Sequence, residues 1–150
     1  MADEHEYLKK GIRSLQDAMR SKAYFKLGDS IANAIFCMAK AKIAVSLHNK
    51  LDIGGASKVS ATILRDAAAI ASKASGEQIG IGARGGAHEK ADVAEAVIGY
   101  GWVFDLVTLD ECATLVAAPY IERKPEKLRD EFEAFVAGFG AVLSRIIERA

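Results

Sequence analysis

Three acidic residues set among apolar ones are the part of this sequence best suited to chemistry. Asp92 and Glu95 are three residues apart in the stretch HEKADVAEAVIGYGW, and Asp29 lies more than sixty residues upstream in YFKLGDSIANAIF. Residues three apart on a helix share a face, so Asp92 and Glu95 are expected to project together. A buried carboxylate without a partner is costly, and Asp29 is therefore expected to meet a cation, a hydrogen-bond donor or a metal ion.

Carboxylates that converge in a helical bundle would form an oxygen-rich site suited to Mg²⁺ or Mn²⁺. A metal ion there can generate a hydroxide nucleophile and stabilise the charge that develops on a phosphodiester. Taken alone, Asp92 and Glu95 have a simpler explanation, since acidic residues near a helix N-terminus interact favourably with the helix dipole. Composition does not decide between these explanations, because it does not bring Asp29 to the other two acids.

The apolar periodicity predicts helices along almost the whole chain, within one domain. Residues 4–23 have the pattern of an amphipathic helix. Residues 30–47 are apolar on every side, which is typical of the central helix of a bundle. Gly28, beside Asp29, would let another helix cross closely. Gly54 and Gly55 are expected to end this central helix.

Further elements follow the first long glycine break. A third helix is predicted to begin at a Ser57 cap and to end at Gly76, before a glycine-rich loop. Helix is expected to resume near Glu89 and to bend around Gly99 and Gly101. The last helix is expected to carry Pro125 near its first turn, where proline is tolerated.

Bulk composition excludes some classes of protein. The 150 residues include 20 Lys plus Arg and 20 Asp plus Glu, so the chain has no basic excess with which to coat nucleic acid by charge alone. Cys37 and Cys112 lie in apolar runs and fit no zinc or disulfide pattern, so they are expected to be buried free thiols. The polar N-terminus is unlike a secretory signal, and no apolar run is judged to reach the ~18 residues of a membrane span. A cytoplasmic protein without a membrane partner is expected.

Two stretches resemble the ribonuclease III family. KLGDSIANAIF is similar to the motif in which Leu-Gly-Asp opens a buried helix, and KADVAEAVIGY to the second motif, Asp-x-x-Glu followed by Ala, apolar residues and Gly. GASKVSATILRDAAAIA stands where the family has its middle helix. The order and spacing agree over residues 24–106, and the match is closest to short forms without a double-stranded-RNA-binding domain, such as the Mini-III enzymes and small archaeal ribonuclease III-like proteins.

The resemblance implies an all-α fold, a ribonuclease III endonuclease-domain-like helical bundle that occupies residues 1–150. It implies that Asp29, Asp92 and Glu95 are the catalytic residues and the ligands of Mg²⁺ or Mn²⁺, with Glu95 the main ligand. The implied function is a metal-dependent endoribonuclease that cleaves double-stranded RNA during RNA processing, leaving 5′-phosphate and 3′-hydroxyl ends. The implied assembly is a homodimer with both sites in one cleft.

Other residues bear on this hypothesis. Lys58, Arg84 and Lys90 flank the predicted site and are candidate contacts to RNA phosphates, although each taken singly could be ordinary surface charge. Asn33 shares a helical face with Asp29 and either bonds the site or satisfies a helix neighbour. Many full-length family members have a glutamate where this chain has Phe25, and the short forms that the chain resembles also tend to lack it, but the loss removes one carboxylate from the usual cluster. The alternative is therefore a catalytically silent relative that binds structured RNA or a ribosomal partner.

Overall fold

The computed structural model describes residues 4–76 and 87–150, with the side chains of residues 87 and 88 left aside. All regular structure in these residues is helical, which confirms the predicted all-α class. The elements are a single 3₁₀ turn, one short helix and five longer helices: η1 (Glu6–Leu8), α1 (Leu15–Ala18), α2 (Lys22–His48), α3 (Ala61–Ser75), α4 (Ala87–Val103), α5 (Leu109–Arg123) and α6 (Leu128–Arg149).

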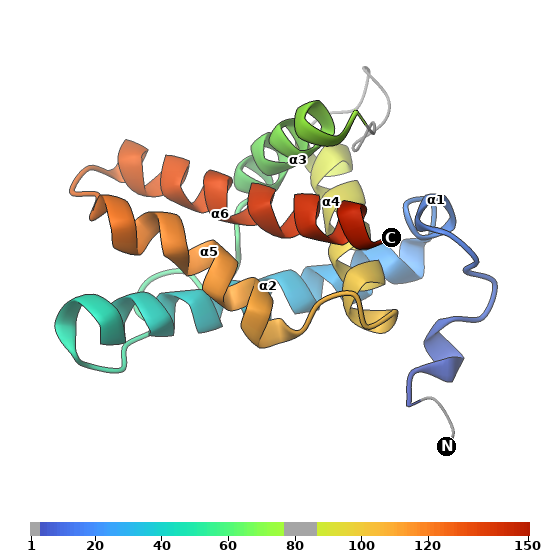
Figure 1. Cartoon of the computed structure of the whole chain (residues 1–150), viewed down its shortest axis with the longest axis horizontal. Coiled ribbons are helices and arrows are strands. Elements are labelled where there is room, and N and C mark those ends of the chain that lie inside the picture. Colours follow the sequence, from blue (N-terminus) through green and yellow to red (C-terminus); the bar gives the residue numbers. More distant parts are fainter. Residues whose placement is uncertain (1–3, 77–86) are drawn as a thin grey trace.

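The five longer helices pack around one apolar core. α2 packs on α4 and α5, α6 packs on α3 and α5, and α3 also contacts α4. Figure 1 shows α4 crossing the N-terminal half of α2, while α5 lies beside the C-terminal half. The chain therefore brings two segments that are far apart in sequence, the N-terminal half of α2 and α4, into direct contact.

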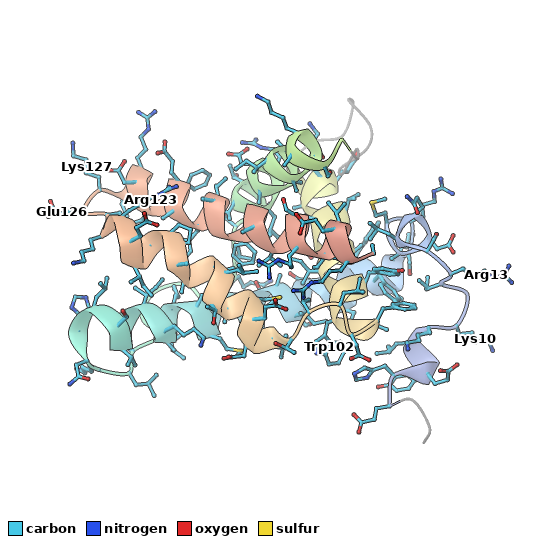
Figure 2. The ribbon with its side chains drawn as sticks, in the orientation of Figure 1. Lys10, Arg13, Trp102, Arg123, Glu126 and Lys127 are labelled. Carbon is cyan, nitrogen blue, oxygen red and sulfur yellow. The ribbon has the colours of Figure 1, made fainter. Side chains whose placement is uncertain are left out.

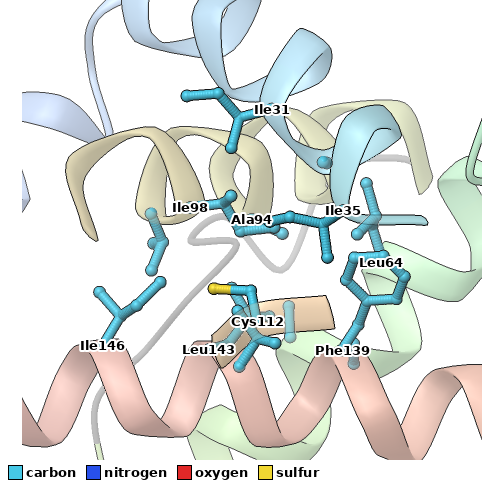
Figure 3. Close-up of a cluster of buried hydrophobic side chains, with 14 of the residues drawn as sticks. Ile31, Ile35, Leu64, Ala94, Ile98, Cys112, Phe139, Leu143 and Ile146 are labelled. Carbon is cyan, nitrogen blue, oxygen red and sulfur yellow. The ribbon is translucent and has the colours of Figure 1, made fainter. Parts of the chain in front are cut away.

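Side chains from α2, α3, α4, α5 and α6 meet in the core, and Figure 3 shows part of this cluster. Ile35 of α2, Leu64 of α3, Ile98 of α4 and Phe139 of α6 have no exposed surface. Burying an aliphatic or aromatic side chain of this size contributes about 1.5–3 kcal/mol. Cys112 of α5 joins this cluster as predicted, whereas Cys37, also expected to be buried, is only half-buried.

The prediction of one amphipathic helix over residues 4–23 is wrong. Gly11 adopts a positive φ of 79°, a conformation that interrupts a right-handed helix, and Ser14 then caps the short α1 by accepting a hydrogen bond from the Asp17 amide. The segment is held on α2 because the Tyr24 hydroxyl donates to the carbonyl oxygen of Leu8 at 2.6 Å. Leu15 and Met19 of the predicted apolar face are buried in the core, whereas Leu8 and Ile12 pack against it only partly buried.

The ends of α2 and α3 differ from the predicted positions. α2 begins at Lys22, so Asp29 lies inside the helix and not at its start. It ends at His48 because Asn49 takes the left-handed conformation, well before the glycines that were expected to stop it. α3 is capped by Ser60, whose hydroxyl accepts from the Ile63 amide at 3.2 Å, and not by Ser57. Its predicted end at Gly76, with φ of 76°, is confirmed.

α4 and α6 also differ in detail from the predicted helices. α4 continues as one helix through Gly99 and Gly101, the positions of the expected bend, and ends at Val103. α6 begins at Leu128, so Pro125 precedes the helix and does not lie in its first turn. Figure 2 shows charged side chains at both ends of the molecule, Lys10 and Arg13 at one and Arg123, Glu126 and Lys127 at the other.

α2 is long and apolar enough to cross a membrane, with a mean hydropathy of 1.4 over its most apolar window. The expectation that no segment would reach this length is wrong on that measure. About a third of the window, 33%, is buried inside the protein. The core helix of a soluble protein passes the same test, so length and hydropathy alone assign α2 no location.

Candidate active site

α2 and α4 cross in backbone contact, and glycine makes the crossing possible. A Cβ atom added to Gly28 would lie 1.7 Å from the carbonyl oxygen of Glu95, closer than any side chain can stand. Gly99 faces the same place, since a Cβ there would lie 3.4 Å from the amide nitrogen of Gly28 and the carbonyl oxygen of Tyr24. The close crossing expected at Gly28 is therefore present, and it sets the side chain after Gly28 opposite Glu95.

The three predicted acids line one pocket at this crossing. Its volume is about 400 Å³, and its walls come from the first two turns of α2 and from α4. All three carboxylates are partly exposed, so solutes can reach them. The lining residues are Lys22, Phe25, Lys26, Asp29, Asp92 and Glu95.

The carboxyl group of Glu95 is the most perturbed acid of the site. Its pKa is raised from an ordinary 4.5 to about 8, mainly by burial and then by the negative charges of Asp29 and Asp92 and a hydrogen bond with Asp29. The ammonium group of Lys58 acts in the opposite direction and lowers the pKa. At neutral pH, the carboxyl group of Glu95 therefore keeps its proton. A bound divalent cation would neutralise the same pair and displace that proton.

Asn33 supports Asp29 from one turn further along α2. Its side-chain amide nitrogen donates to Asp29 Oδ1 at 3.3 Å, and its Oδ1 accepts from the Val59 amide at 2.9 Å. Because Asp29 is both a predicted site residue and a helix neighbour of Asn33, this bond fits both of the roles considered for Asn33. The same residue also satisfies a backbone donor of the α2–α3 loop, so it joins the acid site to that loop.

The donor atoms at this crossing match the preference of hard cations for oxygen. Among the described residues, no three His, Cys, Asp or Glu side chains stand in positions that could hold a metal ion between them. Mg²⁺ keeps several water molecules and is commonly bound by only one or two protein carboxylates together with substrate phosphates. The adjacent pair of Asp29 and Glu95 fits that mode, with Asp92 close enough to act on Glu95. The role of the three acids as metal ligands stays a prediction.

Lys22 and Lys26 line the pocket, although the sequence reasoning did not select them. They are four residues apart and share a face of α2 with Asp29, a spacing that can be read from KAYFKLGD. Cations beside an acidic pair are suited to bind a phosphate whose charge the pocket would otherwise repel. Phe25, the departure from the family pattern, lies between them and lines the same pocket.

The other predicted cations have different positions. Lys58 is exposed in the α2–α3 loop, and its charge reaches Glu95. Lys90 is half-buried on α4, two residues before Asp92. Arg84 lies outside the described residues, so its predicted phosphate contact has no counterpart in the structure.

Three further pockets offer less chemistry, and the smallest, of about 250 Å³, is lined by Gln16, Met19, Arg20 and Val93. One of about 340 Å³ at the α5–α6 connection mixes Arg123, Lys124 and Lys127 with Glu126, Asp130 and Glu133, so its charges balance. A larger one of about 580 Å³ is lined mainly by apolar side chains of α2 and α6, among them Phe36, Phe132 and Phe135. The acid pocket is therefore the best candidate for a reactive site.

Comparison of the chain with protein-family models finds no match, and comparisons with curated proteins and with solved structures find none either.

Proposed function

We propose that this protein is a metal-dependent endoribonuclease of the ribonuclease III type, in its short form, and that it cleaves double-stranded RNA in cytoplasmic RNA maturation. The observation that supports the proposal best is the meeting of Asp29 with Asp92 and Glu95 in one pocket across a glycine-mediated helix crossing. The two stretches that resemble the family's motifs supply these residues. The proposed fold is that of a ribonuclease III endonuclease domain.

In the proposed site, Asp29 and Glu95 would hold Mg²⁺ or Mn²⁺, and Asp92 would complete the site or orient its water. The bound ion would activate a water molecule and neutralise charge developing on the phosphodiester. Asn33 keeps one oxygen of Asp29 in place through its amide. The attack breaks the bond between phosphorus and the 3′-oxygen, which takes up a proton, so the products carry 5′-phosphate and 3′-hydroxyl ends.

RNA would be bound by cations around the acids. Lys22 and Lys26 line the pocket itself, and Lys58 acts on it electrostatically. Lys90 and Arg84 are further candidates from the sequence. Duplex RNA would be read by its A-form shape and its 2′-hydroxyl groups, with little base specificity.

A homodimer is part of the proposal. The chain exposes several large apolar side chains, including Leu51 at 70% and Leu128 at 84%, which supports association with a further apolar surface. Two copies related by a twofold axis would present two acid sites to one duplex, one for each strand.

The second candidate is a catalytically silent protein that binds structured RNA or a ribosomal partner. Phe25 favours it, because this residue occupies the pocket wall where many full-length family members have an additional acid. The absence of three preassembled metal ligands among the described residues also favours it. A protein of this kind would bind RNA through the cations of the site but would not cleave it.

The two candidates can be separated with long duplex RNA and either Mg²⁺ or Mn²⁺. We expect cleavage by the wild-type protein and a loss of at least about a hundredfold in rate for Glu95→Gln. Glu89→Gln is the matched control, because Glu89 is an exposed acid on the same helix. Binding without cleavage by the wild-type protein would favour the silent candidate, and equal rates for both variants would exclude Glu95 from the chemistry.

A further inference from the structure

Three residues on one face of α2 bind the loop that joins α2 to α3, which spans residues 49–60. The Asn33 side-chain oxygen accepts from the Val59 amide at 2.9 Å, and Cys37 Sγ donates to the Ser57 carbonyl oxygen at 3.6 Å. The Lys40 ammonium donates to the Gly54 carbonyl oxygen at 2.8 Å and to that of Ala56. Asn33, Cys37 and Lys40, here called the loop latch, follow one another at helical spacing on the face that also carries Asp29.

The loop has little else to hold it in place. Residues 49–58 are all exposed, and only Val59 packs partly against the core. A segment with few buried apolar contacts has a low free energy of local opening. Its position therefore depends on the polar contacts with α2. The Lys40 ammonium also lies 4.6 Å from the centre of the Phe36 ring. It is therefore held by the loop carbonyl groups and by a cation–π contact.

Two of the latch residues bind the backbone on either side of Lys58, the loop residue whose charge acts on Glu95. Cys37 binds the residue before Lys58, and Asn33 binds the residue after it. The backbone of Lys58 is thus fixed on both sides, and its charge reaches Glu95. Asn33 in addition donates to Asp29, so the contact that fixes Lys58 and the contact that supports the acid belong to one side chain.

We propose that the loop latch of Asn33, Cys37 and Lys40 positions Lys58 beside the acid pocket to bind a phosphate of the substrate. Lys40 does not line the acid pocket, and it is assigned as a positioning residue that acts through the loop. The identity of the ligand as duplex RNA rests on the proposed function, whereas the latch itself rests on the contacts of α2. Lys40 thereby gains a specific role in a chain where most lysines are exposed.

The latch can be tested without RNA by amide hydrogen exchange. The Val59 amide donates to Asn33, so its exchange reports whether the loop is closed. We expect Lys40→Met to speed exchange at Val59 by about tenfold or more. Lys42→Met is the matched control, because Lys42 lies on the same helix and pairs with Asp110 at 3.1 Å instead of the loop. Lys40→Arg should restore slow exchange, because its guanidinium can donate to both carbonyl groups. Unchanged exchange in Lys40→Met would overturn the latch.

The positioning of Lys58 can be tested by binding of a short RNA duplex in EDTA, which prevents cleavage. Each lost phosphate contact reduces the slope of log affinity against log salt concentration by about 0.9 for a B-form duplex, and a similar value is expected here. We expect this reduction in Lys58→Ala and in Lys40→Met, with no further reduction in the double variant and none in Lys42→Met.

The outcomes are distinguishable. Additive losses in the double variant would mean that Lys40 contacts RNA itself, and this would overturn its positioning role. A wild-type protein that binds no duplex would refute the proposed function and the assignment of RNA as ligand, while the exchange at Val59 would still decide whether the latch exists.

Discussion

The carboxyl groups of Asp29 and Glu95 share a hydrogen bond across the crossing of α2 and α4. The two residues are 66 positions apart in the chain and meet because Gly28 lets the helices touch. Two carboxyl groups this close cannot both be ionised at low cost, so the pair retains a proton that separate carboxyl groups would lose at neutral pH. The titration of Glu95 therefore depends on a helix crossing that Gly28 makes possible.

The first prediction concerns pH. The pKa of Glu95 is about 8 in the folded protein, against an ordinary 4.5 in the unfolded chain. Between these values the folded state holds a proton that the unfolded chain has released, so the free energy of unfolding falls as the pH rises from 4.5 to 8. Because Glu95 is partly exposed, the slope should be well below the limit of about 1.4 kcal/mol per pH unit.

Glu95→Gln should remove this slope. We expect the variant to gain stability relative to the wild-type protein as the pH rises from 5 to 8, measured by urea unfolding without divalent ions. Glu89→Gln, an exposed acid of the same helix, should follow the wild-type curve. A wild-type protein whose stability stays level, relative to Glu95→Gln, across this range would show that Glu95 ionises normally.

The second prediction concerns the helix crossing. In Gly28→Ala the new methyl group would stand 1.7 Å from a backbone oxygen of α4, which cannot rotate away. We expect a loss of about 3 kcal/mol or more in the free energy of unfolding. Gly54→Ala is the control, since its Cβ would meet only the Asp52 side chain at 3.4 Å and should change stability by less than about 0.5 kcal/mol. Equal urea midpoints for the two variants would contradict the close crossing.

The helical class was predictable because apolar periodicity is a local signal. The close crossing at Gly28 was also predictable, since a glycine inside an apolar helix costs helix propensity and needs a packing reason. The N-terminal segment was not, because the left-handed turn at Gly11 and the cap at Ser14 override a pattern that fits a helix. Apolar spacing shows which face is buried, but not where the backbone leaves the helix.

The acid pocket was predictable only through the resemblance that joined Asp29 to Asp92 and Glu95. Lys22 and Lys26 were missed because lysines on an amphipathic helix have the pattern of an ordinary solvated face. The bond between Asn33 and Val59 spans 26 residues and depends on how the loop folds back over α2. Such long-range contacts have no local signature in a single sequence.

The third prediction concerns the N-cap of α3, for which the sequence offers two serines, Ser57 and Ser60. The Ser60 hydroxyl accepts from the Ile63 amide at 3.2 Å, whereas Ser57 is exposed in the loop before the helix. Ser60→Ala should therefore lower the free energy of unfolding by about 1 kcal/mol. Ser57→Ala, chemically the same change three residues earlier, should leave it within about 0.5 kcal/mol. Thermal unfolding of both variants measures the difference, and a larger effect at Ser57 would reverse the assignment.

The last prediction concerns Phe25, which stands where many full-length members of the family that the sequence resembles have a glutamate. Phe25 lines the acid pocket and lies one helical turn before Asp29, so Phe25→Glu would add a fourth carboxylate to the site. Without metal, this variant should be less stable than the wild-type protein, because it loses apolar packing and gains like-charge repulsion. With Mn²⁺, its affinity for the ion should rise by about tenfold or more, since charge and ligand number set cation binding. Phe25→Gln is the matched control, because it removes the same ring without adding charge. The measurement is the rise in melting temperature on titration with Mn²⁺, which reports ligand affinity for the folded state. If Phe25→Glu and Phe25→Gln respond alike, the carboxylates of this pocket do not hold a divalent ion, and the silent RNA-binding candidate gains support.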